Sequence, residues 1–157
     1  MARFTLPARL VVVWWPTVSQ PGNLAAPTVA NIAAGQNLIG NGQGEGLATI
    51  NGFETQPSTI PVPDYASRTV GTVPGDVTIP DSSLSFWMDD TTRTLYNAFT
   101  VNATGVFGFF FDGTATTKES RLYPATIISK ERNFARDEGH MFTIGVSLST
   151  PSIGAVV

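Results

Sequence analysis

The segment Gly105–Gly113, with the sequence GVFGFFFDG, constrains the fold of this chain more than any other stretch. Successive side chains of a strand point to opposite faces of its sheet, and this segment is apolar at adjacent positions. A strand of that kind is stable only where both of its faces are covered. The pair Asp112-Gly113 then supplies the residues of a tight turn. The sequence therefore predicts a strand here that is buried on both sides.

Several other segments have strand character, either from β-branched and aromatic residues or from alternation of apolar and polar positions. They are Arg9–Trp15, Leu47–Phe53, Ser83–Asp89, Arg121–Glu131 and His140–Ser149. In the third, Trp87 points to one face, and the other face carries Leu84, Phe86 and Met88. In the last, the residues that share the apolar face are Phe142, Ile144, Val146 and Leu148. These periods predict strands with one face on a core.

One longer helix is expected from Thr91 to about Thr100. Asp90 is placed to accept hydrogen bonds from the free N–H groups of its first turn, and Asp89 also favours that end of the helix dipole. The apolar stripe of this helix consists of Leu95, Tyr96 and Phe99. A shorter helical turn is predicted from Thr28, behind Pro27, to Gly35.

Two segments lack a regular pattern. Gly40–Gly46 carries glycine at alternate positions and is typical of a flexible connector. Gln56–Pro80 contains five prolines and is expected to be a long extended arm, a kind of segment that usually makes contacts or carries function. Taken together, residues 1–157 are predicted to form a single mainly β domain, a β-sandwich or open barrel with one flanking α-helix.

The charge balance restricts the partners. Lys and Arg number 9 against 12 Asp and Glu, for a net charge of −3, which argues against non-specific binding to nucleic acid. Charged residues make up only 13% of the chain, so we expect neighbouring subunits to cover part of the surface. Cysteine is absent, which excludes disulfides and thiolate chemistry. The apolar run Leu10–Trp15 is too short for a signal sequence or a membrane span, which favours synthesis and use in the cytoplasm.

The strongest candidate for a reaction centre is the lone histidine, His140, which follows Asp137 and Glu138. A hydrolytic site needs a nucleophile or a second histidine at a metal, and no G-x-S-x-G motif supplies a serine. These residues are better explained as a polar entrance to the last strand, so no enzyme activity and no cofactor are expected. A calcium site at Asp81, Asp89 and Asp90 lacks the required spacing, and the glycines of Gly40–Gly46 do not match a nucleotide-binding loop.

The aromatic residues offer a different class of function. Trp14, Trp15, Trp87 and Phe109–Phe111 are candidates for a stacking platform, as in a carbohydrate-binding β-sandwich module. Aromatic residues inside apolar strands are more often part of a core or a subunit interface. The ligand-binding module therefore stands as the alternative function.

The order of three segments resembles that of the major tail tube proteins of bacteriophages with long, non-contractile tails. Arg121–Pro151 is similar to their C-terminal part, a strand with an internal proline, a polar connector and a final alternating strand. Pro27–Gly40 is similar to their N-terminal turn and glycine segment, and Val77–Phe99 to their strand followed by a short helix. The resemblance covers most of residues 24–151.

This resemblance implies a structural protein rather than an enzyme. Members of that family assemble into six-membered rings, in which strands of neighbouring subunits join into an inner barrel, and the rings stack into a hollow tube through which DNA passes without specific binding. The implied partners are further copies of the chain and the tape measure, tail terminator and distal tail proteins. The implied location is the virion tail, assembled in the host cytoplasm.

Four regions are then expected to make contacts between subunits. They are the N-terminal arm 1–8, the proline-rich arm 56–80, the C-terminal tail 150–157 and the charged connector before the last strand. The tail is expected to lack order in a free monomer. The residues predicted to make contacts are Arg3, Phe4, Pro61, Pro63, Tyr65, Arg68, Arg136, Asp137, Glu138, Ser152 and Ile153.

Overall fold

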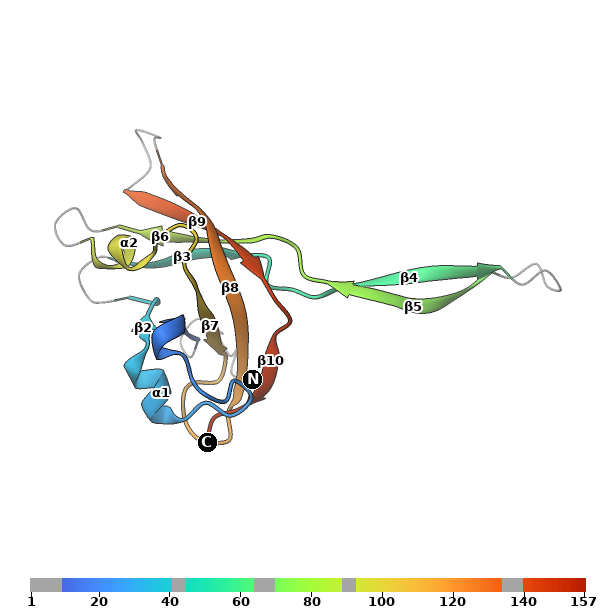
Figure 1. Cartoon of the computed structure of the whole chain (residues 1–157), viewed down its shortest axis with the longest axis horizontal. Helices are drawn as coiled ribbons and strands as arrows, with labels where there is room; N and C mark the ends of the chain where they lie inside the picture. The colour runs from blue at the N-terminus through green and yellow to red at the C-terminus, as the bar shows by residue number, and fades with distance from the viewer. Residues whose placement is uncertain (1–9, 41–44, 64–69, 89–92, 134–139) are drawn as a thin grey trace, which may run out of the picture.

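The computed structural model of the chain describes residues 10–40, 45–63, 70–88, 93–133 and 140–157. Its main sheet is antiparallel, with the strand order β2-β1-β7-β8-β9-β6-β3 and with β10 paired to β8 (Figure 1). The strands are β1 (Val11–Pro16), β2 (Gln36–Asn37), β3 (Gly46–Asn51), β6 (Ser82–Trp87), β7 (Thr104–Phe110), β8 (Glu119–Arg132), β9 (Met141–Leu148) and β10 (Ser152–Ala155). The prediction of a mainly β fold is confirmed.

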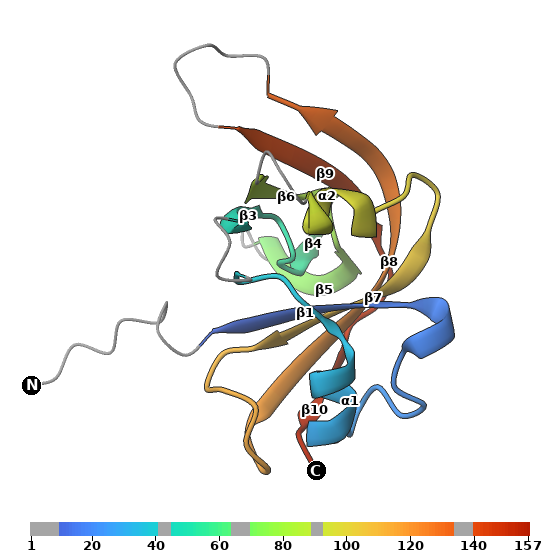
Figure 2. The same cartoon turned by 90° about the vertical axis from the view of Figure 1, so that its left-hand side faces the viewer.

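The main sheet curls until its two ends meet, as Figure 2 shows. Beyond β2, the Leu38 N–H donates to the Val12 carbonyl and the Leu47 N–H donates to the Leu38 carbonyl, both at 2.9 Å. This last bond joins the β2 end of the sheet to β3. Gly46 allows the close approach, because a Cβ atom there would lie 2.5 Å from the Ile39 carbonyl oxygen. Of the two predicted architectures, the structure has the open barrel.

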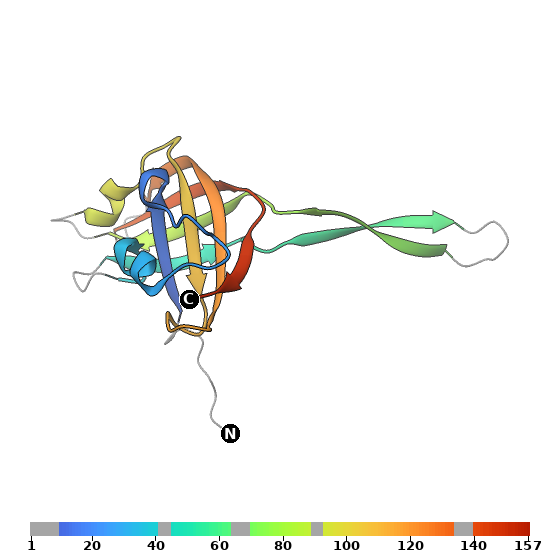
Figure 3. The same cartoon turned by 60° about the horizontal axis from the view of Figure 1, so that its bottom comes forward.

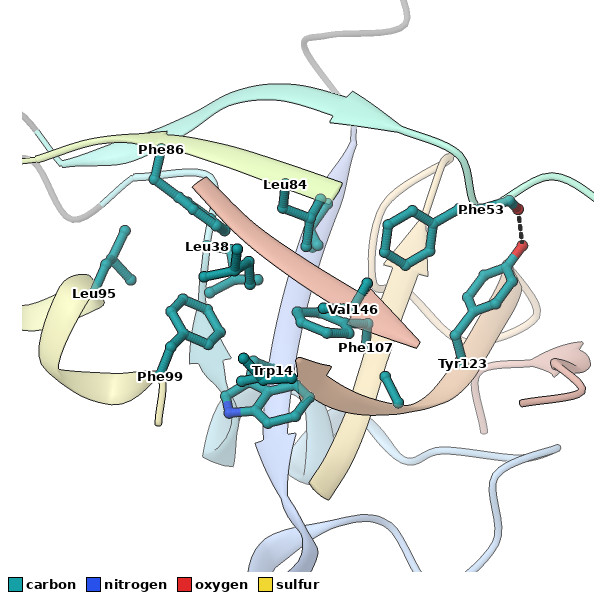
Figure 4. Packing of buried hydrophobic residues seen from close by; sticks show 14 of the residues in the cluster. Trp14, Leu38, Phe53, Leu84, Phe86, Leu95, Phe99, Phe107, Tyr123 and Val146 are labelled. Atoms are coloured by element: carbon teal, nitrogen blue, oxygen red, sulfur yellow. Dashed lines mark hydrogen bonds between the residues drawn. The ribbon is translucent and has the colours of Figure 1, made fainter. Parts of the chain in front are cut away.

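The interior of this barrel is filled with aromatic and aliphatic side chains (Figure 4). Phe86 and Phe142 stack with ring centroids 5.1 Å apart, and the rings of Trp14 and Phe107 approach to 4.4 Å. The predicted apolar faces supply this core, since Leu84, Phe86, Phe142, Ile144 and Val146 are completely buried. Strand periodicity therefore placed these side chains correctly.

A second, smaller core lies on the other face of β1, β7 and β8. Its buried members are Val13, Trp15, Ile32, Val106, Phe110, Leu122 and Val156. Helix α1 (Val29–Ala34) contributes to its cover, and the Trp15 indole N–H donates to the Asn31 carbonyl at 2.8 Å. Strand β7 thus has a core on each face, as its continuous apolar sequence predicted.

Helix α1 begins where the sequence predicted. Thr28 is its N-cap residue and forms a capping box with Asn31, and Gly35 ends the helix. The short 3-10 helix η2 (Thr17–Ser19) precedes it. Neither described α-helix is long and apolar enough to cross a membrane.

Helix α2 (Thr94–Ala98) is shorter than the predicted helix Thr91–Thr100. Arg93 precedes it in a left-handed conformation, with φ of 49°, which prevents the helix from continuing toward its N-terminal side. The Lys130 ammonium donates to the carbonyls of Tyr96 and Phe99 and satisfies the C-terminal end. The proposed capping residues Asp89 and Asp90 lie outside the described residues.

The proline-rich arm differs from the expected irregular segment. It is a two-stranded hairpin of β4 (Gln56–Pro63) and β5 (Val70–Thr78) that projects from the barrel (Figures 1 and 3). A proline removes only the hydrogen bond that its own backbone nitrogen would donate, on one edge of the strand. In a two-stranded ribbon each strand has an unpaired outer edge, and prolines can face that edge. Pro57, Pro61 and Pro63 fall at positions of the same parity on β4, so the ladder with β5 is retained.

The C-terminal tail 150–157 is also more ordered than expected. Ser152–Ala155 form strand β10 along the lower half of β8, and Val156 is buried in the second core. The Val157 N–H donates to the Pro27 carbonyl at 3.0 Å. The expectation of a disordered tail was wrong because the pairing partner of this segment is distant in sequence and leaves no local pattern.

Candidate functional site

Among the described residues, no reaction centre forms around the single histidine. His140 is exposed, and its carbonyl accepts a hydrogen bond from the Met88 N–H at 2.8 Å. Arg136, Asp137 and Glu138 lie outside the described residues. Within the described ranges, no three His, Asp or Glu side chains come close enough to hold a metal ion.

The tryptophans do not form the surface platform that a carbohydrate-binding module requires. Trp14 lies in the barrel core and Trp15 in the second core, and both are buried. Trp87 is 45% exposed, on the outer face of β6. A single exposed ring is a weak stacking surface, so the structure removes the main support for this alternative.

The hairpin arm exposes aliphatic side chains on both of its faces. Ile60 and Val73 lie opposite each other on one face, with Val62 beside them, and they are 54%, 44% and 46% exposed. The other face carries the predicted contact residues Pro61 and Pro63, both exposed. A two-stranded ribbon is at best marginally stable in water by itself, so this arm is suited to a partner surface. The predicted contact residues Tyr65 and Arg68 lie outside the described residues.

The root of the arm is held by a buried network that the sequence reasoning missed. Gly52 and Phe53 both have left-handed backbones, with φ of 83° and 65°. The Ser82 hydroxyl accepts from the Phe53 N–H at 2.9 Å and donates to the Pro80 carbonyl at 3.1 Å. The Tyr123 hydroxyl donates to the Phe53 carbonyl at 3.0 Å (Figure 4). One serine therefore ties the entering and leaving chains of the arm together.

Three shallow hollows surround this root. The largest, of about 620 Å³, lies between the arm and the β9–β10 connection and includes Val77 and Leu148. The other two, of about 320 and 240 Å³, share Phe53, Arg121 and Tyr123 in their walls. These hollows are open to solvent rather than enclosed, so they fit side chains of a partner protein better than a small molecule that must be largely buried.

Two of the predicted contact residues, Ser152 and Ile153, lie in β10 beside these hollows. Ile153 is 61% exposed and contributes to the hollow of about 320 Å³. Nearby, Arg121 Nε donates to Glu119 at 2.6 Å, and this hydrogen bond raises the pKa of Arg121. The predicted contact residues Arg3 and Phe4 lie outside the described residues.

Two strand edges in the main sheet lack a partner strand among the described residues. Strand β3 ends the sheet, and beyond the contact at Leu47 its outer edge faces no other strand. Strand β8 pairs with β7 only up to Thr126, and Ile127 still bonds to Asn102 and Ala103 on that side. From there to Arg132, the edge of β8 has no partner strand among the described residues. Such edges are prone to pair with another chain.

Comparisons with known proteins give a matching family and two similar folds. A family model described as phage tail tube protein matches residues 3–157. The fold is similar to a chain of the 6-fold symmetrised baseplate of the anti-feeding prophage, with 6% identity, a TM-score of 0.55 and coverage of 92% of this chain and 91% of that one. It is also similar to a chain of the PVC sheath-tube complex, an extracellular contractile injection system in its extended state, with 11% identity, a TM-score of 0.55 and 99% coverage of both chains. No curated protein sequence matches the chain.

Proposed function

The chain belongs to the phage tail tube protein family, and on that premise we propose that its copies polymerise, as stacked hexameric rings, into the hollow tube of a virion tail. The family consists of structural tube proteins and is not an enzyme family. The observation that carries the proposal in this chain is the projecting β4–β5 arm, whose aliphatic side chains are exposed on both faces. An arm of that kind is expected to be covered in the assembled protein.

The ring is proposed to close through strand edges. The outer edge of β3 in one subunit is placed to pair with the upper edge of β8 in the next, since both lack a partner strand among the described residues. A contact between two different edges is heterologous, and repeated rotation by the same angle closes such contacts into a ring. Sixfold closure is supported by the 6-fold symmetry of the baseplate that contains a chain of similar fold.

The rings are proposed to stack through the arm. Strand β5 has nine residues, which at about 3.3 Å per residue gives the arm a length of about 30 Å. That length is sufficient to reach a subunit of the adjacent ring. Pro61 and Pro63 then contact the neighbour, as do Tyr65 and Arg68. Ile153 and Ser152 lie on the receiving surface around the arm root.

The remaining partners follow from the same role. We propose that the N-terminal arm with Arg3 and Phe4, and the connector with Arg136, Asp137 and Glu138, contact neighbouring subunits. The tube assembles in the host cytoplasm around a tape measure protein, between a tail terminator and a distal tail protein, and conducts the genome into the host. The resemblance in sequence over residues 24–151 supports a long, non-contractile tail.

Electron microscopy of the purified protein at increasing concentration tests the proposal. The wild type is expected to form rings and tubes, whereas the double variant I60D/V73D is expected to lose the tubes, because it places charges on the aliphatic face of the arm. The control is Val18→Asp, which changes an exposed valine on η2, outside the arm. A wild-type protein that stays monomeric at high concentration would refute the proposed function.

A further inference from the structure

The outer face of the β3-β6-β9-β8 part of the barrel has an unusual composition. The strand register places Thr49, Ser85, Thr143 and Glu131 side by side in one row across the four strands. The next row contains Asn51, Ser83, Gly145 and Ser129. We call these two rows the hydroxyl face. On β3, β6 and β9 these positions alternate with side chains that pack on the core, so they point away from it. On β8 a bulge between Ile127 and Ser129 also brings the exposed Ile128 to this face, beside Gly145.

This face is open in the single subunit. Thr49, Asn51 and Glu131 are exposed, and Ser83 and Thr143 are half-buried. A hollow of about 320 Å³ lies over part of it, against Ser85 and Thr143. The hydroxyls of Ser85 and Thr143 are 2.8 Å apart and form a hydrogen bond across the strands. The face is therefore an ordered surface of small hydroxyl groups.

Its charge pattern differs from that of an ordinary solvated sheet face. Surface positions commonly carry Lys, Arg, Asp and Glu, yet the two rows contain a single charged residue, Glu131. Lys118, Glu119 and Arg121, by contrast, all lie at or beside the lower half of β8, away from these rows. The two rows themselves thus contain no Lys or Arg to bind phosphate groups, and the nearest described cation is Arg132, in the wall of the hollow at the upper end of β8.

The strands that carry this face also carry the two unpaired edges. Joining β3 of one subunit to β8 of the next extends the hydroxyl face from subunit to subunit around a ring. Four strands from each of six subunits, at about 4.8 Å per strand, give a circumference of about 115 Å and a diameter of about 37 Å. Such a ring leaves room inside for a DNA duplex. The opposite side of each barrel is covered by α1 and by Val156, which follows β10, and this suits the outside of the ring.

We propose that the hydroxyl face lines the lumen of the tube and is the surface along which the DNA duplex moves. This inference rests on the proposed function and names the residues that meet the DNA. Uncharged hydroxyls do not neutralise phosphates or release counterions, so the duplex is not held at any one position. Glu131, the single charged residue of the two rows, repels the phosphate backbone and therefore also prevents the duplex from being held.

Single cysteines test this assignment directly, because the chain contains none of its own. Ser83→Cys and Thr143→Cys place a thiol on the hydroxyl face, and Val18→Cys is the matched control on the other side of the barrel. Each variant is treated with a small fluorescent maleimide and with a maleimide coupled to a protein too wide for the lumen. The reactions are run on free subunits and on tubes whose formation has been checked by electron microscopy.

In free subunits, we expect both reagents to label all three cysteines. In tubes, the small reagent is expected to label Ser83→Cys and Thr143→Cys while labelling by the bulky reagent is lost, and Val18→Cys is expected to keep both. Labelling of the two face variants by the bulky reagent in tubes would place the face outside and overturn the inference. Loss of both labels would place it in a subunit contact, which also overturns it. If no tubes form, the proposed function itself fails, and this inference fails with it.

Discussion

Replacing Ser82 with alanine is expected to destabilise the subunit strongly for so small a change. The side chain is buried, and its hydroxyl serves both the Phe53 N–H and the Pro80 carbonyl. Removal leaves the Phe53 N–H without its acceptor in a buried position, at a cost of about 1–3 kcal/mol. Pro80 is only half-buried, so water can replace the Ser82 hydroxyl as the donor to its carbonyl. We therefore expect the free energy of unfolding to fall by about 2 kcal/mol.

The left-handed backbone at Phe53 makes this loss more damaging. A bulky residue with φ of 65° is held there by its surroundings, and such a conformation costs about 1–3 kcal/mol. Without the Ser82 hydroxyl, the contacts that remain among the described residues are the Tyr123 hydroxyl and the packing of the Phe53 ring. The alanine variant is therefore also expected to show faster amide exchange at the arm root.

Urea unfolding followed by circular dichroism measures the effect, at concentrations where the subunit is monomeric. In a thermal melt, a loss of about 2 kcal/mol in a domain of this size is expected to lower the melting temperature by about 4–8 °C. Ser83→Ala is the matched control, because the adjacent serine points to the hydroxyl face, and its change is expected to stay within about 0.5 kcal/mol. A loss below about 0.5 kcal/mol in Ser82→Ala would refute the argument that this hydroxyl holds the arm root.

Two further changes probe the helix start and the C-terminal strand. Thr28→Ala removes the side-chain half of the capping box with Asn31, and we expect a loss of about 1 kcal/mol in urea unfolding, whereas an unchanged midpoint would show that the box contributes nothing. Gly154→Ala places a Cβ against the Ala25 carbonyl, and we expect β10 to detach, so that the Val156 amide exchanges rapidly with solvent. Wild-type protection of that amide in the variant would contradict the close packing of β10.

The sequence predicted the faces of the barrel strands because their signal is local. In β6 and β9, side chains such as Leu84 and Ile144 alternate with Ser83 and Thr143, and the period of two assigns each to the core or to the outside. The covered strand β7 was predicted for a related reason. A strand with adjacent apolar residues has only one stable environment.

The strand pairing within the arm, the strand of the tail and the hydrogen bonds of the arm root were not predicted, because they depend on partners that are distant in the sequence. The prolines of β4 suggested an irregular segment, but a ribbon with open outer sides tolerates them. Ser152–Ala155 has no alternation, and its place is decided by pairing with β8. Ser82 and Phe53 are 29 positions apart, and nothing in either local sequence indicates their hydrogen bond.

The length of β8 has a mechanical consequence for a tube. Its upper half is paired with β9 and has an edge available to a neighbour, while its lower half is held by β7 on one side and β10 on the other. Tension applied to the upper half of β8 is transmitted along the strand to its lower half. It loads the hydrogen bonds to β7 and β10 there in shear. Many hydrogen bonds on two sides then resist the load together instead of opening one after another. The C-terminal strand therefore works as a tension anchor, and a subunit that lost it would yield at a lower force.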